Sequence, residues 1–235
     1  MTKSRLSIIV LIILAGISIA ALSLWPKPAA PVKGALKSVS PVSDTLPSDK
    51  VADMKIDAED SPYLGQSDAP LTLFYWFDFQ CPFCRQFDEE TLPILIDKYV
   101  TTGKLKIVFK NYQFIGPDSQ TAGKTGLAVW ETSPANYQKW HQAVFQKQDI
   151  DNGGWGGQQD LIELTQSISG IDVGKVIQLS LKNEEKYQEK IDADKAEGAK
   201  LNIKTTPSVI IGDQVIKGAQ PTEVYLQVID SLLPK

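Results

Sequence analysis

The pattern of apolar positions begins with one long run near the start of the chain. Residues 6–24 carry no charge, follow two basic residues and are closed by Trp25. As a helix, this run spans about 28 Å, close to the thickness of the bilayer core. We therefore expect residues 1–5 to be cytoplasmic and 6–25 to be a transmembrane signal anchor, with the basic flank inside.

A cleavable signal peptide is the alternative to an anchor. Ser18-Ile19-Ala20 could end a short hydrophobic region ahead of a cleavage site. The apolar run continues past Ala20, and this favours the uncleaved anchor. In either case the chain after Trp25 is expected to be exported.

Residues 26–60 show neither a helical nor a strand period. Prolines alternate there with Lys, Ser, Ala and Val. Such a segment cannot bury enough apolar surface to offset its chain entropy. We expect a flexible linker that holds the following domain near a membrane and leaves it free to reorient.

The pattern changes at the expected domain of residues 61–235. Leu71–Phe77 is an unbroken apolar run typical of a strand buried on both faces. A helix is expected from Pro82 to about Tyr99, with Pro93 as a kink. Lys104–Tyr112 alternates apolar residues with lysines and predicts a second strand.

The rest of the chain carries mostly helical periods. We expect helices at 119–130, 134–147, 158–167, 173–182 and 184–201, then strands at 208–211 and 214–216 and a closing helix at 221–233. The order predicts an α/β fold in which a helical subdomain, about 118–201, is inserted.

Composition and charge agree with a soluble domain that lacks a nucleic-acid partner. The chain is 43% hydrophobic and 22% charged, values typical of globular proteins. Its net charge of −4 argues against nucleic acid, which requires a basic face.

The two cysteines of the chain lie together in Cys81-Pro-Phe-Cys84. Cys81 stands where the strand gives way to the helix, and Pro82 fits the first helical position. Free amide groups and the helix dipole there favour a Cys81 thiolate. Cys84 lies one turn on, within reach of a disulfide. We expect an exposed nucleophile at Cys81 and a shielded resolving thiol at Cys84.

Two other interpretations of the cysteine pair are weaker. A structural disulfide that closes so short a loop removes little unfolded-state entropy. A metal site would need a second pair of ligands, and His141, expected to be a packing or surface residue, is the lone histidine. We therefore expect no metal at the thiols and no cofactor.

The stretch "DIDNGGWGGQQD" partly matches a calcium loop. Asp149, Asp151 and Asp160 take positions one, three and twelve, but Gly153 stands where a side-chain ligand is needed. A plain glycine-rich loop is the expectation.

"CPFC" after an aromatic strand, the helical block and "TTPSVIIGDQVIKGA" together resemble the exported DsbA-like thiol–disulfide oxidoreductases of the thioredoxin superfamily. The resemblance covers about residues 63–233 and implies a thioredoxin-like fold. It implies a cis Pro207 beside the Cys81 sulfur and a Thr206 backbone offered to an extended substrate. It also implies that Phe83 is exposed at the substrate side.

The resemblance implies an activity and partners. The protein would introduce disulfide bonds into reduced, exported polypeptides, as a monomer. A membrane thiol oxidase linked to quinone would reoxidise it. Two departures concern the strength of the oxidant. Tyr75 stands where the family often has a buried acid, with Asp78 the nearest acid in the strand, and Phe83 stands where the strongest oxidants have histidine.

Two alternatives stay open from the sequence. One is a disulfide reductase or isomerase, which would need electrons supplied through the membrane. The other, from a different class, is a membrane-tethered peptide-binding or copper-delivery module that uses the same thiols without turnover.

Overall fold

The structure is a computed structural model that describes residues 55–149 and 153–234. The chain divides into two units, Met1–Ser40 and Pro41–Lys235, and the description below concerns the second. The expected anchor and most of the expected linker lie outside the described residues. Within the described ranges, no helix is both long enough and apolar enough to cross a membrane.

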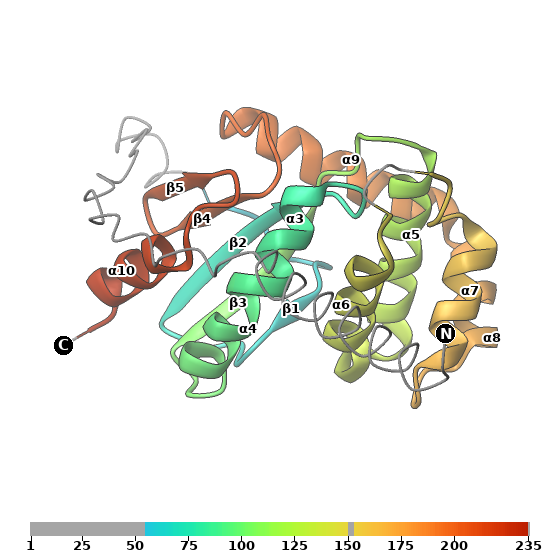
Figure 1. The fold of residues 1–235 in the computed structure, drawn as a ribbon, viewed down its shortest axis with the longest axis horizontal. Helices are drawn as coiled ribbons and strands as arrows, with labels where there is room; N and C mark the ends of the chain where they lie inside the picture. Colours follow the sequence, from blue (N-terminus) through green and yellow to red (C-terminus); the bar gives the residue numbers. More distant parts are fainter. Residues whose placement is uncertain (1–54, 150–152, 235) are drawn as a thin grey trace, which may run out of the picture. The chain divides into compact units, whose positions relative to one another are not determined.

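A five-stranded mixed sheet forms the centre of the domain (Figure 1). Its strands are β1 (Tyr63–Leu64), β2 (Leu71–Phe77), β3 (Leu105–Asn111), β4 (Ser208–Ile211) and β5 (Gln214–Lys217), in the order β1-β3-β2-β4-β5. β2 runs parallel to β3 and antiparallel to β4, so the strand that leads to the thiols is central.

Both faces of β2 are covered, as its unbroken apolar run predicts. Leu73, Tyr75 and Phe77 belong to the main core cluster. Trp76 points to the other face, where it packs with a smaller cluster that includes Ile210. Tyr75, Trp76 and Phe77 are fully buried and form core, as expected for a strand buried on both faces.

One helical run follows β2 with two changes of winding. It consists of α3 (Pro82–Gln86), the π-helical turn η1 (Phe87–Thr91), α4 (Leu92–Leu95) and the π-helical turn η2 (Ile96–Val100). The expected helix from Pro82 to Tyr99 is thus confirmed. Pro93 lies in the first turn of α4, directly after a π turn, which is a common place for a local change of helix direction.

The inserted helical subdomain is present between β3 and β4. It contains α5 (Pro117–Thr132), the 3-10 turn η3 (Pro134–Asn136), α6 (Tyr137–Lys147), α7 (Gln158–Ser167), α8 (Val173–Lys182) and α9 (Glu184–Lys200). In Figure 1, α5 to α8 group at one side of the sheet, and the closing helix α10 (Thr222–Leu232) lies by β4 and β5.

Contacts with the domain begin ahead of Ser61, where we placed its start. Ile56 packs against the smaller core cluster. The Asp57 amide donates to Glu197 Oε1 at 2.7 Å, and its carbonyl accepts from Lys110 Nζ at 2.8 Å. Lys110 is itself buried and forms an ion pair with Asp194 of α9, so this cluster joins the first described residues, the sheet and the helical subdomain.

Candidate active site

Cys81 is the residue that precedes α3, as the sequence predicts. Its backbone is extended, Pro82 occupies the first turn, and the amides of Cys84 and Arg85 both donate to the Cys81 carbonyl at 3.1 Å. Pro82 lacks an amide hydrogen at a position where helices leave that group unpaired in any case. The chain therefore passes from β2 into the helix with the Cys81 sulfur at the helix start.

The loop that leads into β4 lies against this sulfur. The Thr206–Pro207 peptide bond is cis, which confirms the expectation for Pro207. The Cys81 Sγ lies 3.3 Å from the Thr206 carbonyl oxygen, to which it donates when it is protonated. Two segments more than 120 residues apart in the chain therefore meet at the first thiol.

Cys81 is less exposed than we expected. Only 5% of the residue is accessible, and the Thr206 carbonyl oxygen lies against the sulfur. Cys84 is fully buried, as expected for a shielded thiol. Both cysteines are free thiols in this structure, which is therefore the reduced state.

The two thiols have opposite acidities. The pKa of Cys81 falls from 9.0 to about 6, chiefly because the Cys84 side chain donates a hydrogen bond to it, with further help from Thr206 and the amides of Cys84 and Phe83. Burial opposes this fall. Burial, followed by the interaction with Cys81, raises the pKa of Cys84 well above its usual value. At neutral pH the pair carries one thiolate, on Cys81.

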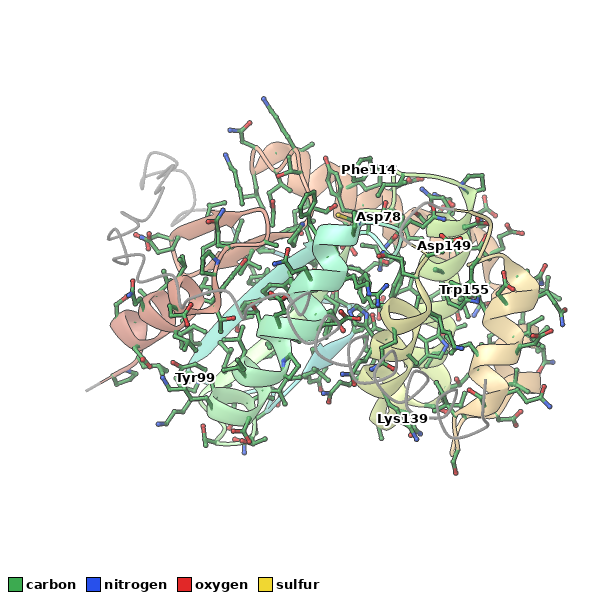
Figure 2. All side chains as sticks on the ribbon, in the orientation of Figure 1. Asp78, Tyr99, Phe114, Lys139, Asp149 and Trp155 are labelled. Carbon is green, nitrogen blue, oxygen red and sulfur yellow. The ribbon has the colours of Figure 1, made fainter. Side chains whose placement is uncertain are left out.

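Asp78 fixes the loops around the thiols. Its Oδ2 accepts from the amides of Phe114 and Ile115 at 2.7 and 3.0 Å. Its Oδ1 accepts from the Gln80 amide at 2.7 Å and the Ser119 hydroxyl at 2.6 Å. Figure 2 labels Asp78 and Phe114 close to the start of α3. The nearest acid in the strand thus serves as an acceptor for two loops.

Apolar side chains are exposed next to this anchored loop. Phe83, between the thiols, is 60% exposed, as the resemblance implies, and Phe114 is 51% exposed. The sequence did not single out Phe114. Its amide is held by Asp78, which precedes Cys81 by three residues, so its position depends on a bond between segments far apart in the chain.

Tyr75 lies beneath Cys84. The residue is fully buried, and its hydroxyl is 3.5 Å from the Cys84 carbonyl oxygen. Its ring packs against Phe87 with ring centres 4.6 Å apart. The position that often carries an acid in DsbA-like proteins is therefore filled by a neutral donor in contact with the second cysteine.

His141 is a buried packing residue on α6, as expected, but it has a partner that we did not foresee. Its Nε2 lies 3.0 Å from Asp88 Oδ2, and both side chains are about 1% exposed. The rings of Phe77 and Phe109 pack on the imidazole. Asp88 follows Cys84 by four residues, and this helical spacing was the one signal available in the sequence.

The described acidic side chains of the glycine-rich loop accept hydrogen bonds from backbone amides. Asp160 Oδ2 accepts from the amides of Gly156 and Gly157 and so caps α7. Asp149 Oδ2 lies 3.4 Å from the Trp155 amide, and Asp151 is outside the described residues. Within 55–149 and 153–234, no group of three or more His, Cys, Asp or Glu side chains could hold a metal ion.

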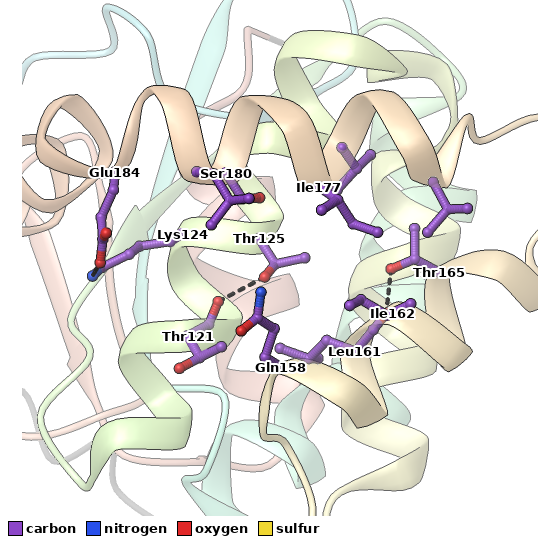
Figure 3. A pocket seen from close by; sticks show the side chains of 13 residues that line it. Thr121, Lys124, Thr125, Gln158, Leu161, Ile162, Thr165, Ile177, Ser180 and Glu184 are labelled. Atoms are coloured by element: carbon purple, nitrogen blue, oxygen red, sulfur yellow. Dashed lines mark hydrogen bonds and ion pairs between the residues drawn. The ribbon is translucent and has the colours of Figure 1, made fainter.

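A separate pocket of about 220 Å³ lies between α5, α7 and α8 (Figure 3). It includes neither thiol. Its threonine hydroxyls donate within their own helices: Thr125 donates to the Thr121 carbonyl at 2.8 Å, and Thr165 donates to the Leu161 carbonyl at 2.6 Å. The chemistry of the domain therefore centres on the thiols.

Comparisons with known proteins show the family to which the chain belongs. The family model described as thioredoxin matches residues 57–231, a range that includes both thiols and Pro207. Disulfide bond formation protein D of Bacillus subtilis is 29% identical over 156 residues, which cover 66% of this chain and 69% of the relative. A protein of Bacillus anthracis named probable disulfide bond formation protein D is 30% identical over 149 residues, with 63% and 68% covered.

Solved structures show the same likeness. The crystal structure of BdbD from Bacillus subtilis, in its oxidised form, superposes with a TM-score of 0.69 at 26% identity and covers 75% of this chain and 94% of that one. DsbA of Chlamydia trachomatis has a TM-score of 0.66 at 20% identity, with 75% and 93% covered, and shows the shared fold.

Proposed function

Because the chain belongs to the thioredoxin family, we propose that it is a thiol–disulfide oxidoreductase that introduces disulfide bonds into exported proteins through Cys81 and Cys84. The observation that carries the proposal is the asymmetry of the pair. Cys81 sits at a helix start with a pKa of about 6, whereas Cys84 is fully buried and its pKa is raised.

The reaction is an exchange of two electrons between sulfur atoms. A substrate thiolate attacks Cys81 Sγ of the Cys81–Cys84 disulfide, and the electron pair of the broken bond stays on Cys84. A second substrate thiolate then attacks the substrate sulfur of the mixed disulfide, and Cys81 leaves as the thiolate. The substrate gains a disulfide, and the enzyme keeps two electrons and, at neutral pH, one proton on Cys84, while the second proton goes to solvent.

The low pKa of Cys81 supports the oxidising direction. A disulfide is a strong oxidant when its reduced form is stabilised, and a stable Cys81 thiolate does this. A value of about 6 lies between the first thiols of thioredoxin, about 7, and DsbA, about 3.5. The names of the Bacillus relatives, disulfide bond formation protein D and its probable counterpart, agree with this direction.

The substrate would bind as an extended segment across the start of α3. The Thr206 backbone lies beside the Cys81 sulfur and offers groups that a substrate strand can pair with. Phe83 and Phe114 present apolar surface next to it. A reduced, unfolded polypeptide offers both the extended backbone and the apolar side chains that fit here.

The apolar run and the proline-rich segment support a cellular arrangement at a membrane. Residues 6–25 would anchor the protein in the cell membrane as a single span, and residues 26–60 would tether the catalytic domain on the extracytoplasmic side. A membrane thiol oxidase linked to quinone would reoxidise the pair after each turnover.

Trapping of mixed disulfides tests the assigned roles. In Cys84→Ala, substrates attached to Cys81 should accumulate, because the enzyme lacks the thiol that expels them. Mixed disulfides should be counted by non-reducing electrophoresis of exported proteins, with Cys81→Ala as the matched control that should accumulate none. Equal trapping by the two variants would overturn the assignment of Cys81 as the nucleophile.

A further inference from the structure

The turn that carries Cys81 obtains backbone hydrogen bonds from side chains. It lies between β2 and α3, where the backbone has left the sheet and has not yet entered the helix. Phe79 in this turn is 2% exposed, and an unpaired amide or carbonyl so deeply buried would be costly. Gln113 Oε1 accepts from the Phe79 amide at 3.0 Å. The conformation of the turn therefore depends on buried side-chain amides.

Gln148 supplies the other amide, from the helical subdomain. It is the residue at which α6 ends, and it is 5% exposed. Its Nε2 donates to the Phe79 carbonyl at 2.7 Å and to the Cys81 carbonyl at 3.1 Å. The amino group is the half of the amide that fits there, because the oxygen would face two carbonyl oxygens. These two bonds, the Gln148 clamp, join the backbone of the nucleophile to α6.

Arg85 makes a contact in the reverse direction. It follows Cys84 in α3, and its Nη1 donates to the Gln148 carbonyl at 3.0 Å. Its Nε donates to Glu89 Oε1 at 2.8 Å, which fixes the side chain along its own helix. The end of α6 and the start of α3 are therefore bound to each other from both sides.

The Cys81 carbonyl connects this clamp with the sulfur of the same residue. It also accepts from the amides of Cys84 and Arg85, both at 3.1 Å, and so closes the first turn of α3. That turn carries the amides of Phe83 and Cys84, which favour the Cys81 thiolate. A further donor on the carbonyl offsets the negative end of its dipole beside the thiolate. Loss of the Gln148 clamp would weaken both effects.

We propose that Gln148 is a positioning residue of the exchange reaction, which holds the Cys81 carbonyl and so keeps the first turn of α3 directed at the Cys81 sulfur. This inference rests on the proposed function. When the second substrate thiolate attacks the mixed disulfide, the bond between the substrate sulfur and Cys81 breaks and its electron pair goes to Cys81 Sγ. The amides that the clamp holds in place stabilise this charge, whereas Gln148 itself exchanges neither protons nor electrons.

Gln148→Met tests the clamp. Methionine is also unbranched, and the substitution removes both donated hydrogen bonds. The pH midpoint of Cys81 alkylation by iodoacetamide should rise by about half a unit, the size expected when part of one hydrogen bond's net free energy acts on the thiolate. The equilibrium constant for oxidation of glutathione by the enzyme at neutral pH should fall by about threefold, because the reduced form is stabilised less.

Gln113→Met is the matched control. Gln113 is fully buried and binds the same turn, at the Phe79 amide and the Phe77 carbonyl, but none of its bonds among the described residues reaches Cys81. This variant should lose thermal stability and keep the wild-type midpoint and glutathione equilibrium. Equal shifts in the two variants would mean that a loosened turn is sufficient to change the pKa, and they would overturn the role of the Cys81 contact.

Gln148→Glu adds a test of sign. The substitution keeps the shape of the side chain, and on ionisation it places a negative charge against the Cys81 carbonyl in place of a donor. The Cys81 midpoint should therefore rise further than in Gln148→Met. A midpoint at or below that of the wild type in either Gln148 variant would overturn this inference, and alkylation reports it without any exchange reaction. Wild-type protein that exchanges no thiols with glutathione or reduced polypeptides would overturn the proposed function instead.

Discussion

Cys84 controls the acidity of Cys81 through one contact between the two side chains. Its hydrogen bond is the largest cause of the fall in the Cys81 pKa from 9.0 to about 6. The rate of Cys81 alkylation by iodoacetamide should therefore rise with pH about a midpoint near 6. Cys84→Ala should move that midpoint up towards 9, and Cys84→Ser, which keeps a donor, should move it less. An unchanged midpoint in Cys84→Ala would mean that Thr206 and the backbone amides are sufficient.

Residues whose roles depend on local chain geometry could be predicted from the sequence. Cys81, Pro82 and Cys84 are set by a strand followed by a helix, and the structure places them as expected apart from the low exposure of Cys81. The Asp88–His141 pair could not be predicted, because its members are more than 50 residues apart and meet only when α6 packs on the helix of the thiols.

The link between α6 and the π turn of the thiol helix is a buried pair in an aromatic cage. Removal of one partner leaves the other buried without compensation. Asp88→Leu and His141→Leu should each lower the free energy of unfolding by about 3–5 kcal/mol, and the double variant should lose less than the sum. Urea unfolding measures the three values. Additive losses would show that the pair has no coupling of its own.

Most helices and strands could be predicted from the spacing of hydrophobic residues, and those that could not have physical reasons. The bounds of β2, α7, α8 and β4 are those expected, because turn residues and charges flank each run. β1 was missed, because two residues make no pattern and pair only through β3. The π turns after α3 were missed too, since they follow from packing rather than from residue preference.

For the molecule as a whole, the thiols connect redox state to stability. In the reduced protein the pKa of Cys81 is about 6 in the folded state and 9.0 in the unfolded state. The contribution of this thiolate to the free energy of unfolding is therefore complete above pH 9 and is lost as the pH falls through 6. Relative to its value well below pH 6, the free energy of unfolding of the reduced form should be higher by about 1.4 kcal/mol at pH 7 and by about 4 kcal/mol at pH 9. Above pH 9 the raised pKa of Cys84 should reverse the trend.

Urea unfolding of the reduced and oxidised proteins across this range measures the effect. The oxidised form has no thiols and otherwise the same ionisable groups, so the difference between the two curves isolates the pair. A reduced form that grows more stable relative to the oxidised form from pH 6 to 9 agrees with an oxidant. Parallel curves would contradict the low Cys81 pKa and favour the reductase or isomerase alternative.

The low exposure of Cys81 and its contact with Cys84 have a consequence for chemical damage. Peroxide attacks thiolates and converts them to sulfenic acid and then, irreversibly, to sulfinic acid. Cys81 is a thiolate at neutral pH, but Thr206 covers it and the Cys84 thiol lies in contact with it. A sulfenic acid formed there would condense with Cys84, release water and restore the working disulfide. The contact between the two sulfurs thus converts an oxidised Cys81 back into the disulfide form that oxidises substrates.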